Sequence, residues 1–338
     1  MPAPSYRHEP QDFADRQARN RRLSAGIVLF FLLFFSLVGL SVDYLYLDAF
    51  TPAGLPLPVA TVVSLSLATG ITITSYYYGS DFILRSLGAE SLDMQIPEHR
   101  ELRNIVTEMA LASGCRMPKV YVIFDPAPNA FATGRDEAHA SVCVTTGLLA
   151  LLNREETQGV MAHEIAHIRN QDILLMTMVS VLLGGIAVLS DWAQRVSYSS
   201  RSRRGAGGKN LMIVIPALLL IILSPLISRL LAMAVSRQRE YLADATAAEY
   251  TRNPLGLAKA MERIRDAAMP FHRASGGTAH LFFVNPLRRR VDDREGRLAD
   301  LLSTHPPIVR RIMVLYQMAG LPGGIKGLRV QGLEGLKG

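Results

Sequence analysis

Cysteine, tryptophan and charge are all scarce in this chain of 338 residues. It has two cysteines and one tryptophan, and charged residues make up 19% of the sequence. Cys115 and Cys143 belong to no CxxC pair and have no histidine beside them, which argues against a disulfide framework and a cysteine-based zinc site. We expect both to be buried packing residues. The net charge is +7, but the basic residues form no stripe interleaved with aromatic residues. No nucleic-acid partner is therefore expected.

Four long apolar stretches accompany the low charge and indicate that part of the chain lies in lipid. The first two, at about 25–46 and 55–78, exceed the roughly 20 residues that cross a bilayer. The first is too long for a signal-peptide core and precedes no small-residue cleavage site, so we interpret it as an uncleaved anchor. The third, at about 173–190, is only just long enough, and prolines and an arginine interrupt the fourth, at about 211–235. These two stretches either cross the membrane or form a hairpin that does not.

The distribution of basic residues predicts the orientation in the membrane. Four arginines lie within residues 16–22, just before the first apolar stretch, whereas the loop after it carries Asp43 and Asp48 and no Lys or Arg. The positive-inside rule then places the N-terminus and the chain after about Ser80 in the cytoplasm. The loop between the third and fourth stretches is also basic, with five Lys and Arg residues against Asp191, which leaves the path of that hairpin open.

The soluble part is predicted to be mainly helical, with a small sheet. Residues 98–113 have an apolar stripe of Leu102, Ile105, Met109 and Leu111 and are followed by Gly114, which predicts an amphipathic helix. Short apolar runs predict strands at 120–123 and 140–145, in a sheet of about three strands, and a further strand at 281–284. The expected segments are a cytoplasmic N-terminal segment 1–24, a transmembrane hairpin 25–79, a first cytoplasmic part 80–172, a second hydrophobic hairpin 173–235, a second cytoplasmic part 236–320 and a flexible tail 321–338.

The most informative short motif is His163-Glu164-Ile165-Ala166-His167. Asn153 is a plausible N-cap for a helix that contains this motif and continues toward Asp172. On a helix, residues four apart share a face, so His163 and His167 would point at one metal ion, and Glu164 would reach a water beside it. The alternative is a helix with two ordinary histidines and a surface glutamate. A zinc protease would also need a third ligand from elsewhere in the chain.

The third ligand is not identified by the motif itself. A third histidine six residues after His167 is absent, since that position is Ile173. Further along, Glu240 and Asp244 are four residues apart and would share a helix face, where one carboxylate could bind the ion and the other could fix the tautomer of a ligand histidine. An exposed acidic ridge paired with neighbouring arginines is the alternative. Spacing alone leaves both interpretations open.

Longer motifs add a family resemblance. Residues 236–244 read Ser-Arg-Gln-Arg-Glu-Tyr-Leu-Ala-Asp, residues 129–134 read Asn-Ala-Phe-Ala-Thr-Gly, and residues 303–307 read Ser-Thr-His-Pro-Pro. Together with residues 163–167, these motifs resemble the HtpX heat-shock membrane metalloprotease family, which is related to the CaaX prenyl proteases. The resemblance runs from about residue 22 to 321, with four apolar stretches in matching order. It implies an α+β, mainly helical fold: a gluzincin-like zinc metalloprotease domain with a small β-sheet, anchored by about four transmembrane helices.

The resemblance also implies residue roles. Glu240 would be the third ligand, beside His163 and His167, of one zinc ion per chain, and Asp244 would orient His163. Glu164 would then take the proton of the attacking water and pass it to the leaving nitrogen.

Three further residues receive roles only from the resemblance. Asn129 and Ala130 would lie on the edge strand that meets the substrate backbone, and His305 would stabilise the oxyanion. Without the family, Asn129 would be interpreted as a turn residue and His305 as a surface residue. Arg311 would either support the loop of His305 or be an ordinary surface arginine.

The expected function is zinc-dependent endopeptidase activity on unfolded or damaged membrane proteins, as membrane-protein quality control under stress. The expected location is a bacterial-type inner membrane, multi-pass, with the active site in the cytoplasm, and the sequence gives no indication of oligomeric state. Charged residues around the motif, including Arg154, Glu156, Arg169 and Asp172, argue against an intramembrane site-2-type protease. Four apolar stretches are too few for a CaaX-type chamber. A catalytically silent scaffold is disfavoured because every predicted catalytic group is present.

Overall fold

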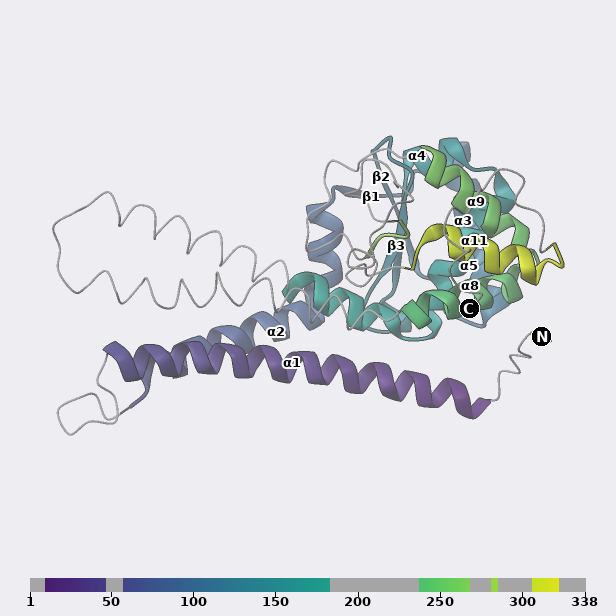
Figure 1. The fold of residues 1–338 in the computed structure, drawn as a ribbon. Helices are drawn as coiled ribbons and strands as arrows, with labels where there is room; N and C mark the ends of the chain where they lie inside the picture. Colours follow the sequence, from purple (N-terminus) through teal and green to yellow (C-terminus); the bar gives the residue numbers. More distant parts are fainter. Residues whose placement is uncertain (1–9, 47–56, 183–236, 268–280, 285–305, 322–338) are drawn as a thin grey trace.

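The computed structural model describes residues 10–46, 57–182, 237–267, 281–284 and 306–321, and all structural statements below concern these residues. A long arm of two helices lies beside a domain in which helices pack against a sheet (Figure 1). The arm consists of α1 (Pro10–Tyr46) and α2 (Val59–Ser86), and α2 leads directly into the domain. This arrangement separates the apolar arm from the polar domain, as the composition predicted.

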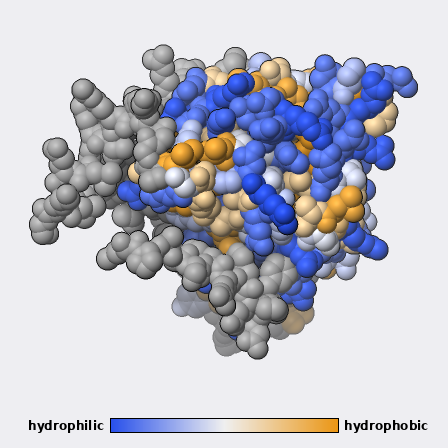
Figure 2. Space-filling model, turned by 90° about the vertical axis from the view of Figure 1, so that its right-hand side faces the viewer, coloured by the Kyte–Doolittle hydropathy of each residue, from blue (hydrophilic) through white to orange (hydrophobic). Residues whose placement is uncertain are grey.

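The arm is the membrane-spanning candidate. Residues Gln17–Tyr44 of α1 and all of α2 are long and apolar enough to cross a bilayer. Large apolar side chains such as Leu37 and Val63 are more than half exposed on these helices. Apolar side chains exposed over such a length are suited to lipid rather than water. By contrast, the face of the domain in Figure 2 is mainly hydrophilic with small separate apolar patches.

The last two predicted apolar stretches are only partly described. The third is represented by a shorter apolar helix, Asp172–Leu182, which packs against α1 and α2 through Leu175, Met178 and Val179. Its continuation after residue 182 and the whole fourth stretch lie outside the described residues, as does the predicted tail after residue 321. Two of the four predicted spans thus have matching helices, while the crossing of the other two and the segment boundaries remain predictions.

The sheet has four strands, one more than expected. They are β1 (Ala89–Ser91), β2 (Lys119–Ile123), β3 (Ala130–Thr133) and β4 (Ser141–Thr145), in the order β1-β2-β4-β3. The β2–β4 pair is parallel and the other two pairs are antiparallel. The predicted strands at 120–123 and 140–145 are confirmed as β2 and β4. Strand β3 lies at one edge of the sheet and packs against helix α5 (Arg154–Arg169).

The strand predicted at 281–284 is wrong. Leu281, Phe282 and Phe283 are buried, as are all the residues of β3 and β4, but among the described residues this segment is not one of the paired strands of the sheet. The segment forms a turn and bends instead. A backbone hydrogen bond connects it to the edge of the sheet, with Phe283 N donating to Ala130 O at 2.9 Å.

Helix α5 is the centre of the domain and packs against β3 and three other helices. Its apolar residues belong to the main core cluster. The remaining helices of the domain are α3 (Pro97–Ser113), the 3-10 turn η1 (Glu137–His139), α4 (Thr146–Leu151), α5 (Arg154–Arg169), α8 (Arg237–Thr251), α9 (Pro254–Ala267) and α11 (Ile308–Met318). The mainly helical α+β class is therefore confirmed.

Helix α3 agrees with its prediction except at one position. It is followed by Gly114, whose positive φ of 68° forms the expected left-handed C-cap. Leu102 and Met109 are buried, but Leu111 is 77% exposed and does not belong to the stripe. Two helical steps from Met109 turn the side chain by about 200°, toward solvent.

Of the two cysteines, Cys143 is buried as expected, whereas Cys115 is only partly buried.

Candidate metal centre

Helix α5 begins with a complete capping box. The Asn153 side chain accepts a hydrogen bond from the Glu156 backbone N–H at 3.0 Å, and the Glu156 carboxylate accepts one from the Asn153 backbone N–H at 3.0 Å. This confirms the predicted N-cap and fixes where the helix starts. The helix ends at Arg169, and Gln171 has a positive φ of 58°. The helix predicted to run toward Asp172 therefore ends three residues before it, because the chain turns at Gln171 and a new helix begins at Asp172.

Three potential ligands converge between α5 and α8. The Nε2 atoms of His163 and His167 are 3.1 Å apart, and oxygens of Glu240 lie 3.8 and 3.7 Å from them, respectively. All three side chains are buried. Bonds of 2.1 Å to a tetrahedral zinc ion would separate neighbouring ligand atoms by about 3.4 Å. The observed spacing and the donor set of two imidazoles and one carboxylate therefore fit a catalytic zinc site.

A buried carboxylate holds the other nitrogen of each histidine. His163 Nδ1 lies 3.0 Å from Asp244 Oδ1, and His167 Nδ1 lies 3.1 Å from Asp172 Oδ2. An ionised carboxylate only accepts hydrogen bonds, so each Nδ1 carries the proton. Both Nε2 lone pairs are then directed at the space that Glu240 also faces. This arrangement is typical of histidines that bind metal.

The two histidines differ in their protonation. Burial, together with Arg311 and the neighbouring histidine, lowers the pKa of His163 to about 4 despite the nearby Asp244. Burial also acts to lower the pKa of His167, but Asp172, Glu240 and other carboxylates outweigh it and raise that pKa to about 9. His163 is therefore held neutral by its surroundings, and the carboxylates around His167 favour positive charge at that position, as they would for a bound cation.

Arg311 is buried in the site rather than exposed at the surface. Only 2% of its side chain is exposed, and its Nε and Nη2 atoms donate to the two oxygens of Asp244 at 2.8 and 2.7 Å. Its Nη1 lies 3.2 Å from Glu240. Burial acts to raise the pKa of Asp244, but Arg311 holds it below its usual range. Arg311 thus keeps charged the carboxylate that orients His163, and the surface alternative for Arg311 is wrong.

Glu164 lies between the histidines and the sheet. Burial is the main influence that raises its pKa to about 7, with Glu240 adding to it and His167 and Arg311 opposing it. The backbone N–H of Ala132 in β3 donates to its carboxylate. A carboxylate with a pKa near neutral both accepts and returns a proton readily, which suits a general base.

A comparison with known families supports the chemistry of this centre. The model of peptidase family M48 matches residues 97–319, which span the sheet, α5, α8 and α11. The chain belongs to peptidase family M48. It is therefore a metalloprotease, and the arm of α1 and α2 makes it a membrane-associated one. Membership of M48 also implies a metal, which the group of His163, His167 and Glu240 could hold.

Curated relatives resemble nearly the whole M48 chain. A "Protease HtpX homolog" of Caldanaerobacter subterraneus is 42% identical over 85% of this chain and 93% of its own length. Proteins of the same name from Thermoanaerobacter pseudethanolicus and Dictyoglomus turgidum are 44% and 39% identical, covering 85% and 92% of this chain and 93% and 96% of theirs. The crystal structure of S. mikatae Ste24p aligns with 86% of this chain and 62% of its own, with a TM-score of 0.46 and 18% identity. The predicted resemblance to HtpX is confirmed.

The predicted substrate residues of this M48 domain lie at the edge of the sheet. Asn129 precedes β3 and Ala130 begins it, and both are buried. The Asn129 carbonyl accepts from Thr145 N on β4, which leaves the Ala130 carbonyl directed away from the sheet. The edge position agrees with the expectation, while contact with a substrate remains a prediction. His305 lies outside the described residues.

Two residues of the network were not predicted from the sequence. Asp172, counted above among the charges around the motif, is 1% exposed and is the partner of His167. Its other oxygen accepts from Asn20 of α1 at 2.6 Å. Neither Asp172 nor Asn20 lies in a recognisable motif. The only sequence signal for the contact between Asp172 and His167 was that they are five residues apart.

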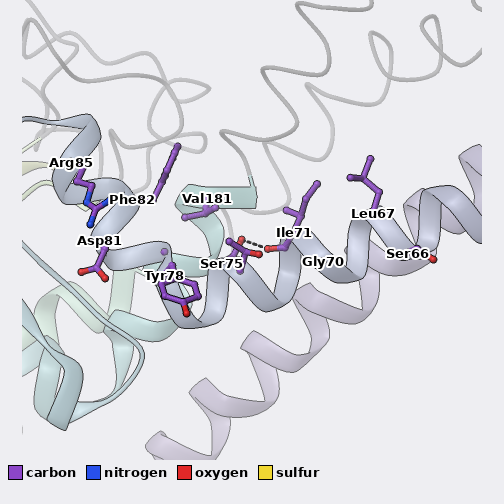
Figure 3. Close-up of a pocket in the computed structure, with 12 residues that line it drawn as sticks. Ser66, Leu67, Gly70, Ile71, Ser75, Tyr78, Asp81, Phe82, Arg85 and Val181 are labelled. Carbon is purple, nitrogen blue, oxygen red and sulfur yellow. Dashed lines mark hydrogen bonds between the residues drawn. The ribbon is translucent and has the colours of Figure 1, made fainter.

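A separate hollow on α2 contains none of these groups. Its volume is about 680 Å³, and Leu67, Ile71 and Phe82 of α2 line it together with Val181 of the helix Asp172–Leu182 (Figure 3). Asp81 and Arg85 are its charged residues. With no histidine and an apolar lining along a membrane helix, it is no candidate for the protease site.

Proposed function

We propose that this M48 protein is a zinc-dependent endopeptidase, with one zinc ion per chain held by His163, His167 and Glu240. The observation that carries the proposal is the convergence of these three buried side chains beside Glu164. When bound, zinc would act as a Lewis acid that makes a water molecule a good nucleophile and polarises the peptide carbonyl. Two imidazoles and a carboxylate are the ligand set that zinc prefers in peptidases.

In this proposal, Glu164 moves the proton of the reaction. Its carboxylate takes a proton from the attacking water and delivers it to the departing amide nitrogen. Burial and a pKa of about 7 suit both steps at neutral pH. Asp244 and Asp172 orient the two imidazoles, and His305 stabilises the developing oxyanion.

The proposed substrates are unfolded or damaged membrane proteins, which present extended segments at the membrane surface, and the proposed role is quality control under stress. Support comes from the arm of apolar helices and from the position of β3 at the end of the strand order, where an extended peptide could pair at Asn129 and Ala130. No nucleic-acid partner is proposed. Folded soluble proteins offer no such extended segment and would be poor substrates.

The proposed location is a bacterial-type inner membrane, crossed several times, with the N-terminus and the active site in the cytoplasm. The start of α1 and the end of α5, which carries the metal centre, are expected on the same side of the membrane because three hydrogen bonds connect them. Gln17 donates to Arg169 O, Asn20 to Asn170 O and Arg21 to the side chain of Gln171. The arginines in this part of α1 favour the cytoplasmic side.

The decisive experiment is purification of the full chain in detergent, metal analysis and a cleavage assay on an unfolded membrane protein. We expect about one zinc per chain and activity that is lost with a chelator and restored by zinc. Glu164→Gln should retain the metal and lose cleavage by roughly 10²-fold or more. Cleavage that persists after complete zinc removal, or at the parent rate in Glu164→Gln, would contradict the proposal.

A further inference from the structure

The edge of β3 that faces the metal centre is occupied by residues 281–284 of the same chain. Phe283 N donates to Ala130 O at 2.9 Å. The side chain of Asn129 holds Val284 at both backbone groups, since its Nδ2 donates to Val284 O at 2.8 Å and its Oδ1 accepts from Val284 N at 3.2 Å. A side-chain amide that both donates to and accepts from one residue imitates the pairing of a neighbouring strand.

The side chain and carbonyl of Phe283 lie against the metal centre itself. Its ring is 5.0 Å from the His163 ring, in an edge-to-face contact. The guanidinium of Arg311 lies 5.0 Å above the same ring, and Arg311 Nη1 is 3.5 Å from Phe283 O. Phe283 is only 2% exposed. One residue of the chain thus contacts a proposed ligand, a guanidinium and the edge strand at once.

We propose that residues 281–284 are an internal occupant of the substrate groove, which a substrate must displace. The inference rests on the proposed function, because it assumes that substrates pair with β3. The acceptor on Ala130 and the two polar groups of Asn129 can bond to only one segment at a time, so the internal segment and a substrate compete for them. The enclosed position of the Phe283 ring further indicates that the groove takes a large apolar or aromatic side chain beside His163.

Competition of this kind lowers the apparent affinity for substrate by the fraction of molecules in which the groove is open. If the open form is on the order of 1–10% populated, release of the segment would strengthen binding by about tenfold to a hundredfold. Phe283→Ala removes the aromatic contacts with His163 and Arg311 and should favour the open form. Leu102→Ala is the matched control, since it truncates another buried side chain of the same core cluster, on helix α3.

The test measures the affinity of a dye-labelled unfolded peptide for the zinc-loaded, detergent-purified full chain in a Glu164→Gln background. We expect Phe283→Ala to lower Kd at least about fivefold and Leu102→Ala to leave it unchanged. A peptide with Phe at its central position should also bind more tightly than one with Asp there. Equal Kd values in the parent and a folded Phe283→Ala protein would overturn the proposal.

Hydrogen exchange provides a test that does not depend on the folding of a Phe283 variant. In the Glu164→Gln protein, bound peptide should increase the exchange of the Phe283 and Val284 amides, while the β4 amides stay protected. Unchanged protection at these two amides in the peptide complex would overturn the internal-occupant inference and leave the protease function standing. Failure of the parent protein to cleave with zinc bound would instead refute the proposed function.

Discussion

The strongest prediction concerns Asp172, which no motif identified. Its two oxygens receive donors from three directions: His167 Nδ1 at 3.1 Å, Asn20 Nδ2 at 2.6 Å and, at a longer 3.8 Å, Arg239 Nη1. Asp172→Asn preserves the size of the side chain but offers one acceptor oxygen in place of two. The amide nitrogen then faces a donor, which leaves a buried polar group unsatisfied.

Two magnitudes follow from this geometry. An unsatisfied buried donor costs about 1–3 kcal/mol of folding stability. Loss of the carboxylate that fixes the tautomer of a metal-binding histidine typically weakens metal binding by about 10- to 100-fold, or about 1.4–2.8 kcal/mol. We therefore expect the zinc Kd of Asp172→Asn to rise by one to two orders of magnitude, roughly.

The assay is a zinc titration against a fluorescent chelator on the detergent-purified chain, with denaturant unfolding measured in parallel. Asp136→Asn is a suitable control, because Asp136 also contacts a histidine, His139 Nδ1 at 2.7 Å, but at an exposed site in the turn η1. The control should keep the parent zinc Kd. A zinc Kd within about twofold of the parent in Asp172→Asn would refute the argument that Asp172 orients His167.

Two other substitutions test the packing and charge around the centre. Arg311→Met leaves Asp244 as a buried charge without its guanidinium, and should lower the free energy of unfolding by about 3–5 kcal/mol; a loss below about 1 kcal/mol in a urea titration would contradict the buried pairing. Gly159→Ala would place a Cβ 2.7 Å from the backbone N of Leu257, where α5 meets α9. This substitution should lower the free energy of unfolding by about 1–3 kcal/mol, which would be measured as a lower Tm. An unchanged Tm would contradict the close packing of α5 against α9.

The sequence predicted local features of the site well because short-range chemistry determines them. The Asn153 cap fixes the start of α5, and helical periodicity alone brings His163 and His167 to one face. The pairing of Glu240 with these residues depends on how α8 packs on α5, which spacing does not encode. Its identification required the family motif, and the structure places the residue in the same cluster.

Asp172 and Arg311 show why the remaining parts were not predicted. On a continuous helix, the five residues from His167 to Asp172 would turn the side chain by about 140°, away from the histidine. The positive φ of Gln171 ends α5 and redirects the chain so that Asp172 faces back. Arg311 is a single basic residue on α11, and its burial depends on Asp244 of α8, which is distant in sequence.

The contact of Asn20 with Asp172 links the membrane arm to the metal centre. Asn20 of α1 donates to Asp172, which accepts from His167, so two hydrogen bonds connect the arm to a proposed ligand. Asn20 is itself buried and also donates to Asn170 O at the end of α5. Because a buried carboxylate is stabilised by each donor it receives, removal of α1 would withdraw one donor from the group that orients His167. Helix α1 is therefore part of the support of the site as well as a membrane anchor.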